Sequence, residues 1–170
     1  MNKDRNSSPA RVRFLHVIHL LTVTLWLGGV ACVFALTIRA FGLDAAGFIQ
    51  AAPLVLWIFP HFLLPVAVAS LLEGLYYGFL TKWGFFRHKW LLAKWLLFLA
   101  NGPLIGAGCI GQMQAALARA QSGAYIGGLA DGGGVLLALA GHIALLTVMY
   151  ILSVYKPGKA GAKKQEPKSA

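Results

Sequence analysis

Long apolar blocks separated by short polar segments are the main pattern along the chain. Four such blocks run approximately over residues 14–38, 53–80, 90–113 and 135–155. Each block is long enough to cross the ~30 Å hydrocarbon core of a bilayer as a helix. Backbone groups in lipid must bond within their own segment, so the blocks predict transmembrane helices. Because the connections are short, consecutive helices should be antiparallel neighbours, and we expect an all-α, four-helix, up-and-down transmembrane bundle.

Two of the connections carry patterns of their own. The segment 42–52 contains AAGFIQAA and predicts a short interfacial helix. The segment 114–134 contains an amphipathic QAALARAQ stretch followed by GGLADGGG, which predicts a flexible glycine-rich loop. Small residues within the blocks should let helices approach closely, and the candidates are Gly28, Gly29, Gly102, Gly106 and Gly108.

Composition and charge agree with this membrane interpretation. The chain is 58% hydrophobic and only 12% charged, about half the charged share of a soluble domain. Its net charge of +10 is concentrated in the tail 1–13, the connection 81–89 and the tail 156–170. Positive charge gathers on the cytoplasmic side, so both tails of the membrane domain 14–155 should be cytoplasmic. We expect a multi-pass protein of a bacterial inner membrane whose basic tails contact lipid and not nucleic acid.

Several titratable side chains fall at one inner level of the predicted membrane region. His16 and His19 share a face of the first helix, Glu73 lies two turns before the inner end of the second, and Lys94 lies just over a turn inside the third. Such groups cost ~2.5 kcal/mol or more at membrane depth, so they are functional candidates. In the alternative interpretation, Glu73 and Lys94 form a structural ion pair, and His16 only contacts headgroups.

A stripe of polar and small residues on the third helix predicts a face that looks into the bundle. Lys94, Asn101 and Gly108 are seven residues apart, and Gln112 follows four residues later. This spacing places all four on one helix face, which should look into the bundle.

Two further histidines fall at one outer level. His61 on the second helix and His142 on the fourth each lie about two turns from the outer end of their helix. Two imidazoles at matching depth are typical of axial ligands that hold b-type haem between helices. The alternative is that each ring bonds a backbone carbonyl or a hydroxyl group, and the spacing itself is not a specific motif.

Two stretches carry a family resemblance. They are LHVIHLLTVTLWLGGVACVFAL over 15–36 and EGLYYGFLTKWGFFRHKWLLAKWLLFL over 73–99. Together they resemble an uncharacterised bacterial family of small four-helix membrane proteins with a "TGL…WG.FRH.W…K" element. The resemblance covers about the first two thirds of the chain.

More distantly, the chain is similar to CopD-type copper-resistance domains and to the HemJ-type membrane protoporphyrinogen oxidase. The matching residues are His19, then Trp26 with the small pair 28–29, and Trp90 followed by Lys94. The HemJ resemblance implies a b-type haem site that includes His19 and Lys94. The run VACVFALTIRA departs from the HemJ pattern, and the three methionines are too few for a methionine-lined copper path. We therefore transfer no enzyme activity.

These observations favour a membrane protein that binds b-type haem for electron transfer or for quinone or porphyrin redox chemistry. His19, His61 and His142 are the candidate iron ligands, and a quinone or another redox partner is expected. The alternative is a cofactor-free membrane subunit or transporter, with copper import as a variant of it. The small helix faces would also suit a homodimer or a larger membrane complex.

Overall fold

The computed structural model describes residues 9–80 and 89–155, and in these ranges the chain forms four rods. The first rod is α1 (Pro9–Phe41), and the fourth is α6 (Gly128–Tyr155). The second joins α2 (Ala45–Ile58), the π-helical η1 (Phe59–Leu63) and α3 (Leu64–Leu80). The third joins α4 (Lys89–Pro103), the π-helical η2 (Leu104–Gly111) and α5 (Gln112–Gln121).

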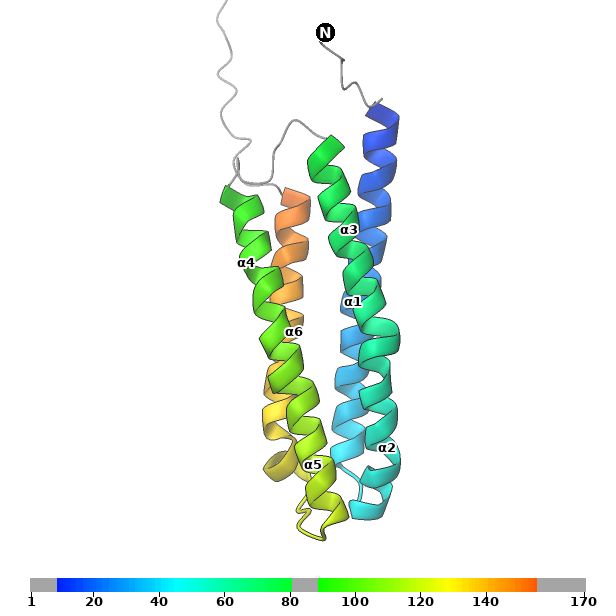
Figure 1. Cartoon of the computed structure of the whole chain (residues 1–170), viewed down its shortest axis with the longest axis vertical. Coiled ribbons are helices and arrows are strands. Elements are labelled where there is room, and N and C mark those ends of the chain that lie inside the picture. Colours follow the sequence, from blue (N-terminus) through cyan, green and yellow to red (C-terminus); the bar gives the residue numbers. More distant parts are fainter. Residues whose placement is uncertain (1–8, 81–88, 156–170) are drawn as a thin grey trace, which may run out of the picture.

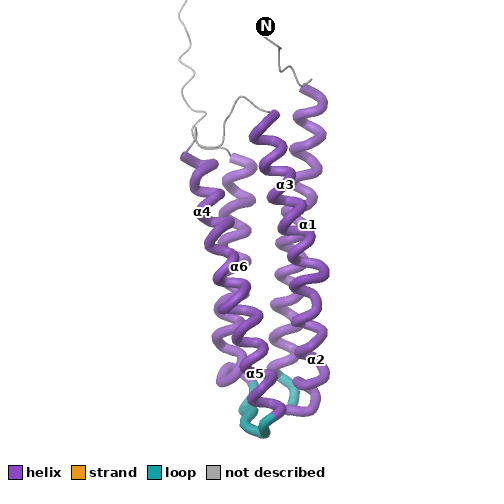
Figure 2. The backbone as a smooth tube through the Cα atoms, viewed as in Figure 1, coloured by secondary structure: helices purple, strands orange, loops and turns teal. Residues whose placement is uncertain are grey.

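The rods run up and down as the hydrophobic pattern predicts. The start of α1, the end of α3, the start of α4 and the end of α6 lie at one end of the bundle (Figure 1). The loops between α1 and α2 and between α5 and α6 lie at the other end (Figure 2). The all-α, four-helix bundle is therefore confirmed for the described residues.

Every rod is long and apolar enough to cross a membrane. Large apolar side chains are exposed along the outside of the bundle, for example Leu21, Leu72, Leu96 and Leu137. Such a surface suits lipid and not water, which supports a multi-pass membrane protein. Of the basic tails, the structure describes only residues 9–13 of the first. Of the connection 81–89, which includes His88, it describes only Lys89.

The second rod begins earlier than the sequence predicts. The segment expected as a separate interfacial helix is the first part of α2, which starts at Ala45. The side chain of Asp44 accepts a hydrogen bond of 2.9 Å from the amide of Gly47 and so caps this start. Pro53 lies inside α2 without ending it, a position that membrane helices tolerate.

The glycine-rich segment before the fourth rod is mostly helical, so the prediction of a flexible loop there is wrong. α5 continues the third rod to Gln121, and α6 already begins at Gly128. Asp131 holds the short loop, since its Oδ2 accepts from the amides of Ile126 at 2.7 Å and Gly127 at 2.8 Å. These bonds compensate for the low helix propensity of the glycines that follow.

Close approach of helices is confirmed at two of the predicted glycines. A Cβ added at Gly29 would lie 2.7 Å from the Phe62 ring, and one at Gly108 would lie 2.8 Å from Cβ of Ala138. Nothing lies within 4 Å of an added Cβ at Gly28, Gly102 or Gly106, so the prediction is wrong for these three within a single chain.

Candidate functional site

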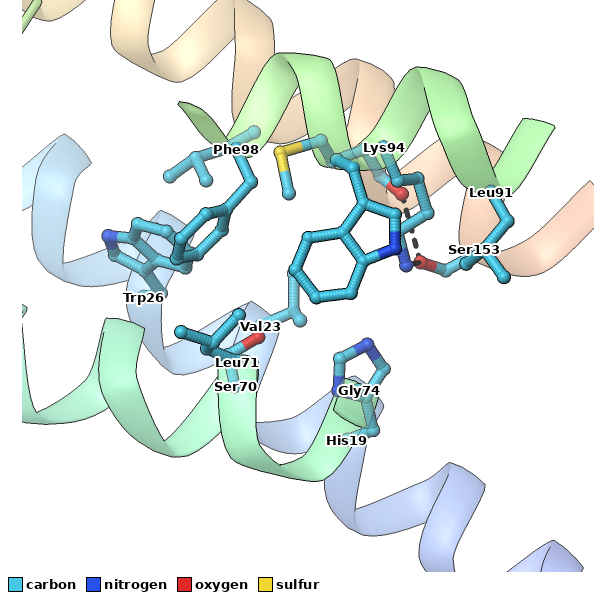
Figure 3. A pocket seen from close by; sticks show the side chains of 13 residues that line it. His19, Val23, Trp26, Ser70, Leu71, Gly74, Leu91, Lys94, Phe98 and Ser153 are labelled. Carbon is cyan, nitrogen blue, oxygen red and sulfur yellow. Dashed lines mark hydrogen bonds between the residues drawn. The ribbon is translucent and has the colours of Figure 1, made fainter. Parts of the chain in front are cut away.

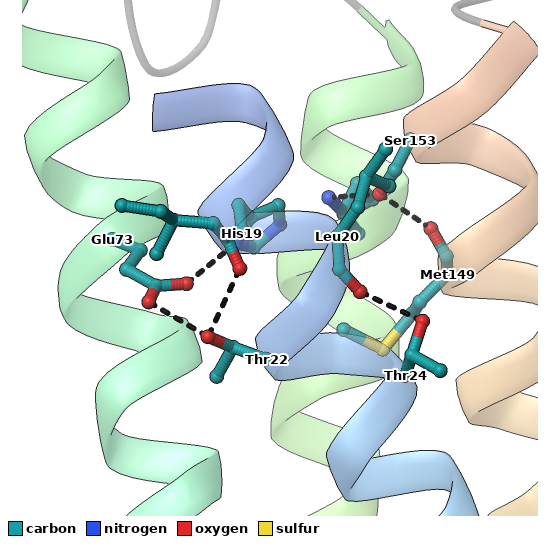
Figure 4. Close-up of polar contacts among 9 residues, drawn as sticks. His19, Leu20, Thr22, Thr24, Glu73, Met149 and Ser153 are labelled. Carbon is teal, nitrogen blue, oxygen red and sulfur yellow. Dashed lines mark hydrogen bonds and ion pairs between the residues drawn. The ribbon is translucent and has the colours of Figure 1, made fainter. Parts of the chain in front are cut away.

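The inner half of the bundle brings His19 and Glu73 together from α1 and α3. Nδ1 of His19 lies 3.2 Å from Oε2 of Glu73. The hydroxyl of Thr22, one turn further along α1, lies 2.8 Å from Oε1 of the same carboxylate. Figure 4 shows both α1 side chains facing Glu73. The His19 and Glu73 side chains are only 14% and 24% exposed, so the bonds are formed largely out of solvent.

This pairing fixes the chemistry of the His19 ring. An ionised carboxylate only accepts hydrogen bonds, so Nδ1 of His19 is the donor. In a neutral ring the lone pair then lies on Nε2. A histidine whose Nδ1–H is held by a carboxylate is the arrangement that orients metal-binding imidazoles and raises their basicity. Nε2 is therefore the nitrogen of His19 through which the ring could bind a metal.

Lys94 lies across the bundle from His19 and contacts α6. Its Nζ donates to Oγ of Ser153 at 2.7 Å, and that hydroxyl donates to the carbonyl of Met149 at 2.9 Å. Glu73 and Lys94 thus have identified partners in His19 and Ser153 respectively. The direct ion pair between Glu73 and Lys94 remains a prediction.

His19 and Lys94 line one pocket, as the sequence predicts for an inner site. Its volume is about 60 Å³. Its lining residues come from α1, α3, α4 and α6. Figure 3 shows the His19 ring extending into this pocket from α1. The other walls are largely aromatic and aliphatic, namely Val23, Trp26, Leu71, Leu91, Trp95, Phe98, Leu146 and Met149, with Ser70, Gly74 and Ser153.

The remaining inner candidates surround this pocket without lining it. His16 is half-buried one turn before His19. Asn101 is buried on α4, where its Nδ2 donates to the carbonyl of Leu97 at 2.8 Å and lies 3.8 Å from Sδ of Met149. Asn101 therefore faces inward, as its place in the polar stripe predicts.

The outer pair, His61 and His142, is placed in two different environments. His61 is exposed, its Nδ1 lies 2.8 Å from the carbonyl of Trp57, and its ring stacks on the Trp57 ring with centroids 4.3 Å apart. His142 is fully buried on α6, edge-on to Trp26 at 5.9 Å. Among the described contacts none joins the two imidazoles. His61 makes the carbonyl contact of the alternative interpretation, and joint haem ligation by the pair remains a prediction.

His142 has neither ring nitrogen bonded to a protein group, although both are buried. Unpaired polar groups in the interior cost about 1–3 kcal/mol each. We expect His142→Leu, which keeps a similar volume, to raise the unfolding temperature by a few degrees. Thermal unfolding in detergent measures this, with His61→Leu at the exposed site as a near-neutral control. A lower unfolding temperature together with loss of a bound cofactor would show instead that the His142 ring is a ligand.

Sequence reasoning did not select several residues that complete the inner site. Thr22, Ser153 and Trp95 are the main ones. Thr22 follows His19 by three residues and so shares its helix face, which is a usable signal. Ser153 follows His142 by eleven residues on the same face of α6. Hydroxyl groups are common in membrane helices, where they bond to backbone carbonyls, so neither position stands out by residue type alone.

The described residues do not supply the donor set of a bare metal-ion site. An ion held by side chains alone needs about three or four ligands. The described residues contain no group of three or more histidine, cysteine, aspartate or glutamate side chains arranged for this. Haem iron already has four porphyrin nitrogens and needs one or two protein ligands.

Comparison of the chain with protein-family models, with curated proteins and with solved structures finds no match in any of the three. The resemblances to the CopD and HemJ types therefore remain predictions. Fold and site define a multi-pass four-helix membrane protein with a hydrogen-bonded histidine, glutamate and threonine cluster, of which the histidine lines a pocket inside the bundle.

Proposed function

We propose that this protein binds one b-type haem in the inner pocket, with His19 as an axial ligand, in the cytoplasmic membrane of a bacterium. The observation that supports this most is the bond between Nδ1 of His19 and Glu73, which leaves Nε2 to bind iron. Trp26, Trp95 and Phe98 provide the apolar aromatic walls that suit a macrocycle.

Lys94 supports the same proposal by its charge and position. It lines the pocket with His19 but comes from α4, on the other side of the bundle. Haem carries propionate groups, and an ammonium group at the inner end of the pocket pairs well with a carboxylate. When bound, the haem supplies the one-electron chemistry, while the chain binds and orients it and excludes water.

The volume of the pocket sets a condition on this proposal. A cavity of about 60 Å³ is well below the ~300 Å³ at which small-molecule pockets begin. The donor set thus fits haem, but the macrocycle is larger than this pocket, whose side walls include Leu71 of α3 and Trp95 of α4. Binding should therefore be accompanied by a rearrangement of these side walls.

An optical spectrum tests the proposal. The protein is expressed in haem-replete cells, purified in detergent, and its reduced-minus-oxidised difference spectrum is recorded. We expect the bands of a b-type haem that copurifies with the chain through size-exclusion chromatography. A featureless spectrum, which stays featureless after haemin is added to the purified protein, would overturn the proposal.

A cofactor-free proton-binding site in a membrane subunit or transporter is the second candidate, and the small pocket favours it. About 60 Å³ suits roughly two water molecules at ~30 Å³ each. Water next to His19 and Glu73 would form a short proton relay. A colourless protein favours this candidate, and proton uptake by vesicles containing Glu73→Gln or Lys94→Gln would then be compared with the parent.

A further inference from the structure

The outer surface of the second rod carries two polar side chains at mid-membrane depth. The span Ala45–Tyr76 has 32 residues and is about 48 Å long at 1.5 Å per residue. Trp57 and His61 are near its middle, within the ~30 Å hydrocarbon core. Trp57 is 55% exposed, and His61 is exposed as well. Titratable side chains at this depth usually face the bundle interior, and tryptophan at a lipid boundary usually lies at headgroup level.

The two rings present one hydrogen-bond donor and one acceptor to this surface. Nδ1 of His61 lies 2.8 Å from the carbonyl of Trp57 and must donate to it, so the lone pair of the neutral ring lies on Nε2. The rings stack with centroids 4.3 Å apart and an interplanar angle of 8°, so the indole N–H and Nε2 cannot bond to each other. Within residues 9–80 and 89–155, no side chain or backbone group bonds to either atom.

A groove next to this pair has room for side chains of another helix. It lies between α1 and the second rod, its volume is about 660 Å³, and Trp57 is one of its lining residues. Thr24, Gly28 and Cys32 line it from α1 at four-residue spacing, so they share one helix face. A Cβ added at Gly28 meets nothing within 4 Å. Small residues at this spacing let membrane helices approach closely.

We propose that a second copy of this chain packs on this surface as a two-fold dimer, in which the Trp57 N–H of each copy donates to Nε2 of His61 in the other. Copies inserted with one orientation are related by an axis along the membrane normal, which brings equal depths together. Because the two rings are stacked, the donor and the acceptor lie at nearly the same depth. The surface is therefore electrostatically complementary to itself. Lipid chains could fill the groove, but they offer no partner to either group.

This dimer goes beyond the proposed function and does not depend on it. The residues that line the groove and those that line the inner pocket are different, so each copy keeps its own inner site. The dimer and the haem can therefore be tested separately.

Trp57→Phe tests the hydrogen bonds, because it removes the N–H and keeps a ring for the stack. Full-length chains with donor and acceptor fluorophores are mixed in lipid vesicles, and the dimer affinity is measured by energy transfer as lipid dilutes the protein. We expect dimerisation to weaken roughly tenfold, since each dimer loses two bonds. His61→Phe should have the same effect. The double variant should be no weaker than either single variant, because the two residues act as one pair.

Gly28→Leu tests the groove. The added side chain projects into it and meets nothing within 4 Å of its Cβ in the single chain, so we expect loss of the dimer in the same assay. Gly102→Leu is the matched control, at an exposed glycine of α4 that is equally open and lies outside the groove. Both variants should unfold in dilute detergent at or above the parent's temperature, because leucine favours helix over glycine.

Two results would overturn the inference, whatever the haem spectrum shows. One is a parent protein that stays monomeric in vesicles, which would leave the surface to lipid or to a different membrane protein. The other is a dimer whose affinity is unchanged in Trp57→Phe or in Gly28→Leu, which would show that the copies meet through another face.

Discussion

Replacing His19 with alanine is expected to remove nearly all of the bound haem. The change deletes the proposed iron ligand and leaves Glu73 facing an enlarged apolar pocket. Haem content per chain, measured by the pyridine haemochrome assay on the purified protein, should fall to background. The unfolding temperature of the haem-free forms of parent and variant establishes that the bundle still folds.

His16→Ala is the matched control, since it removes a histidine one turn away on the same helix. It should keep most of the haem, because His16 is not among the residues that line the pocket.

Glu73→Gln tests whether Glu73 positions the His19 ring without itself binding the iron. It should retain haem but raise the midpoint reduction potential, because a neutral amide donates less electron density through the imidazole than a carboxylate. Full haem content in His19→Ala would show that another residue is the ligand.

Asp131→Ala is expected to cause a large loss of stability at the outer end of the bundle. The carboxylate is 4% exposed, accepts from two loop amides and lies 2.6 Å from Nε of Arg119. Its removal leaves these three donors without their shared acceptor, at a cost of roughly 2–4 kcal/mol. For a chain of this size the unfolding temperature should fall by about 5–10 °C.

Asp44→Ala is the control for that prediction. Asp44 also holds a loop next to a helix start, but through a single exposed cap bond to Gly47. Loss of such a cap costs about 1 kcal/mol, so its effect should be clearly smaller. Equal losses for Asp131→Ala and Asp44→Ala would contradict the view that Asp131 is the main constraint on the outer loop.

Hydrophobic block length was sufficient to predict the number and order of the rods, because lipid allows few alternatives to a continuous helix. It was not sufficient to predict their ends. The glycine-rich stretch before the fourth block looks like a loop by propensity, yet it is mostly helical, and Asp131 bonds the preceding loop and Arg119 of α5. Such compensation depends on contacts between segments, which local composition does not contain.

The sequence predicted only part of the candidate site, again because contacts between helices are not contained in local composition. Matching depth on neighbouring helices brought His19, Glu73 and Lys94 to one place, and depth follows directly from sequence position. The partners of these groups depend on helix rotation. Rotation places Glu73 against His19, and Lys94 against Ser153. It also leaves His61 on the outside and His142 inside, although their depths agree.

The haem content of the unmodified protein tests the central claim most directly. The chain is purified from haem-replete cells, its concentration is determined by amino-acid analysis, and its haem is measured by the pyridine haemochrome assay. The account predicts one b-type haem per chain, at the pocket lined by His19 and Lys94. A value of zero that persists after haemin is added would contradict it and would leave the histidine and glutamate cluster as a proton-binding site.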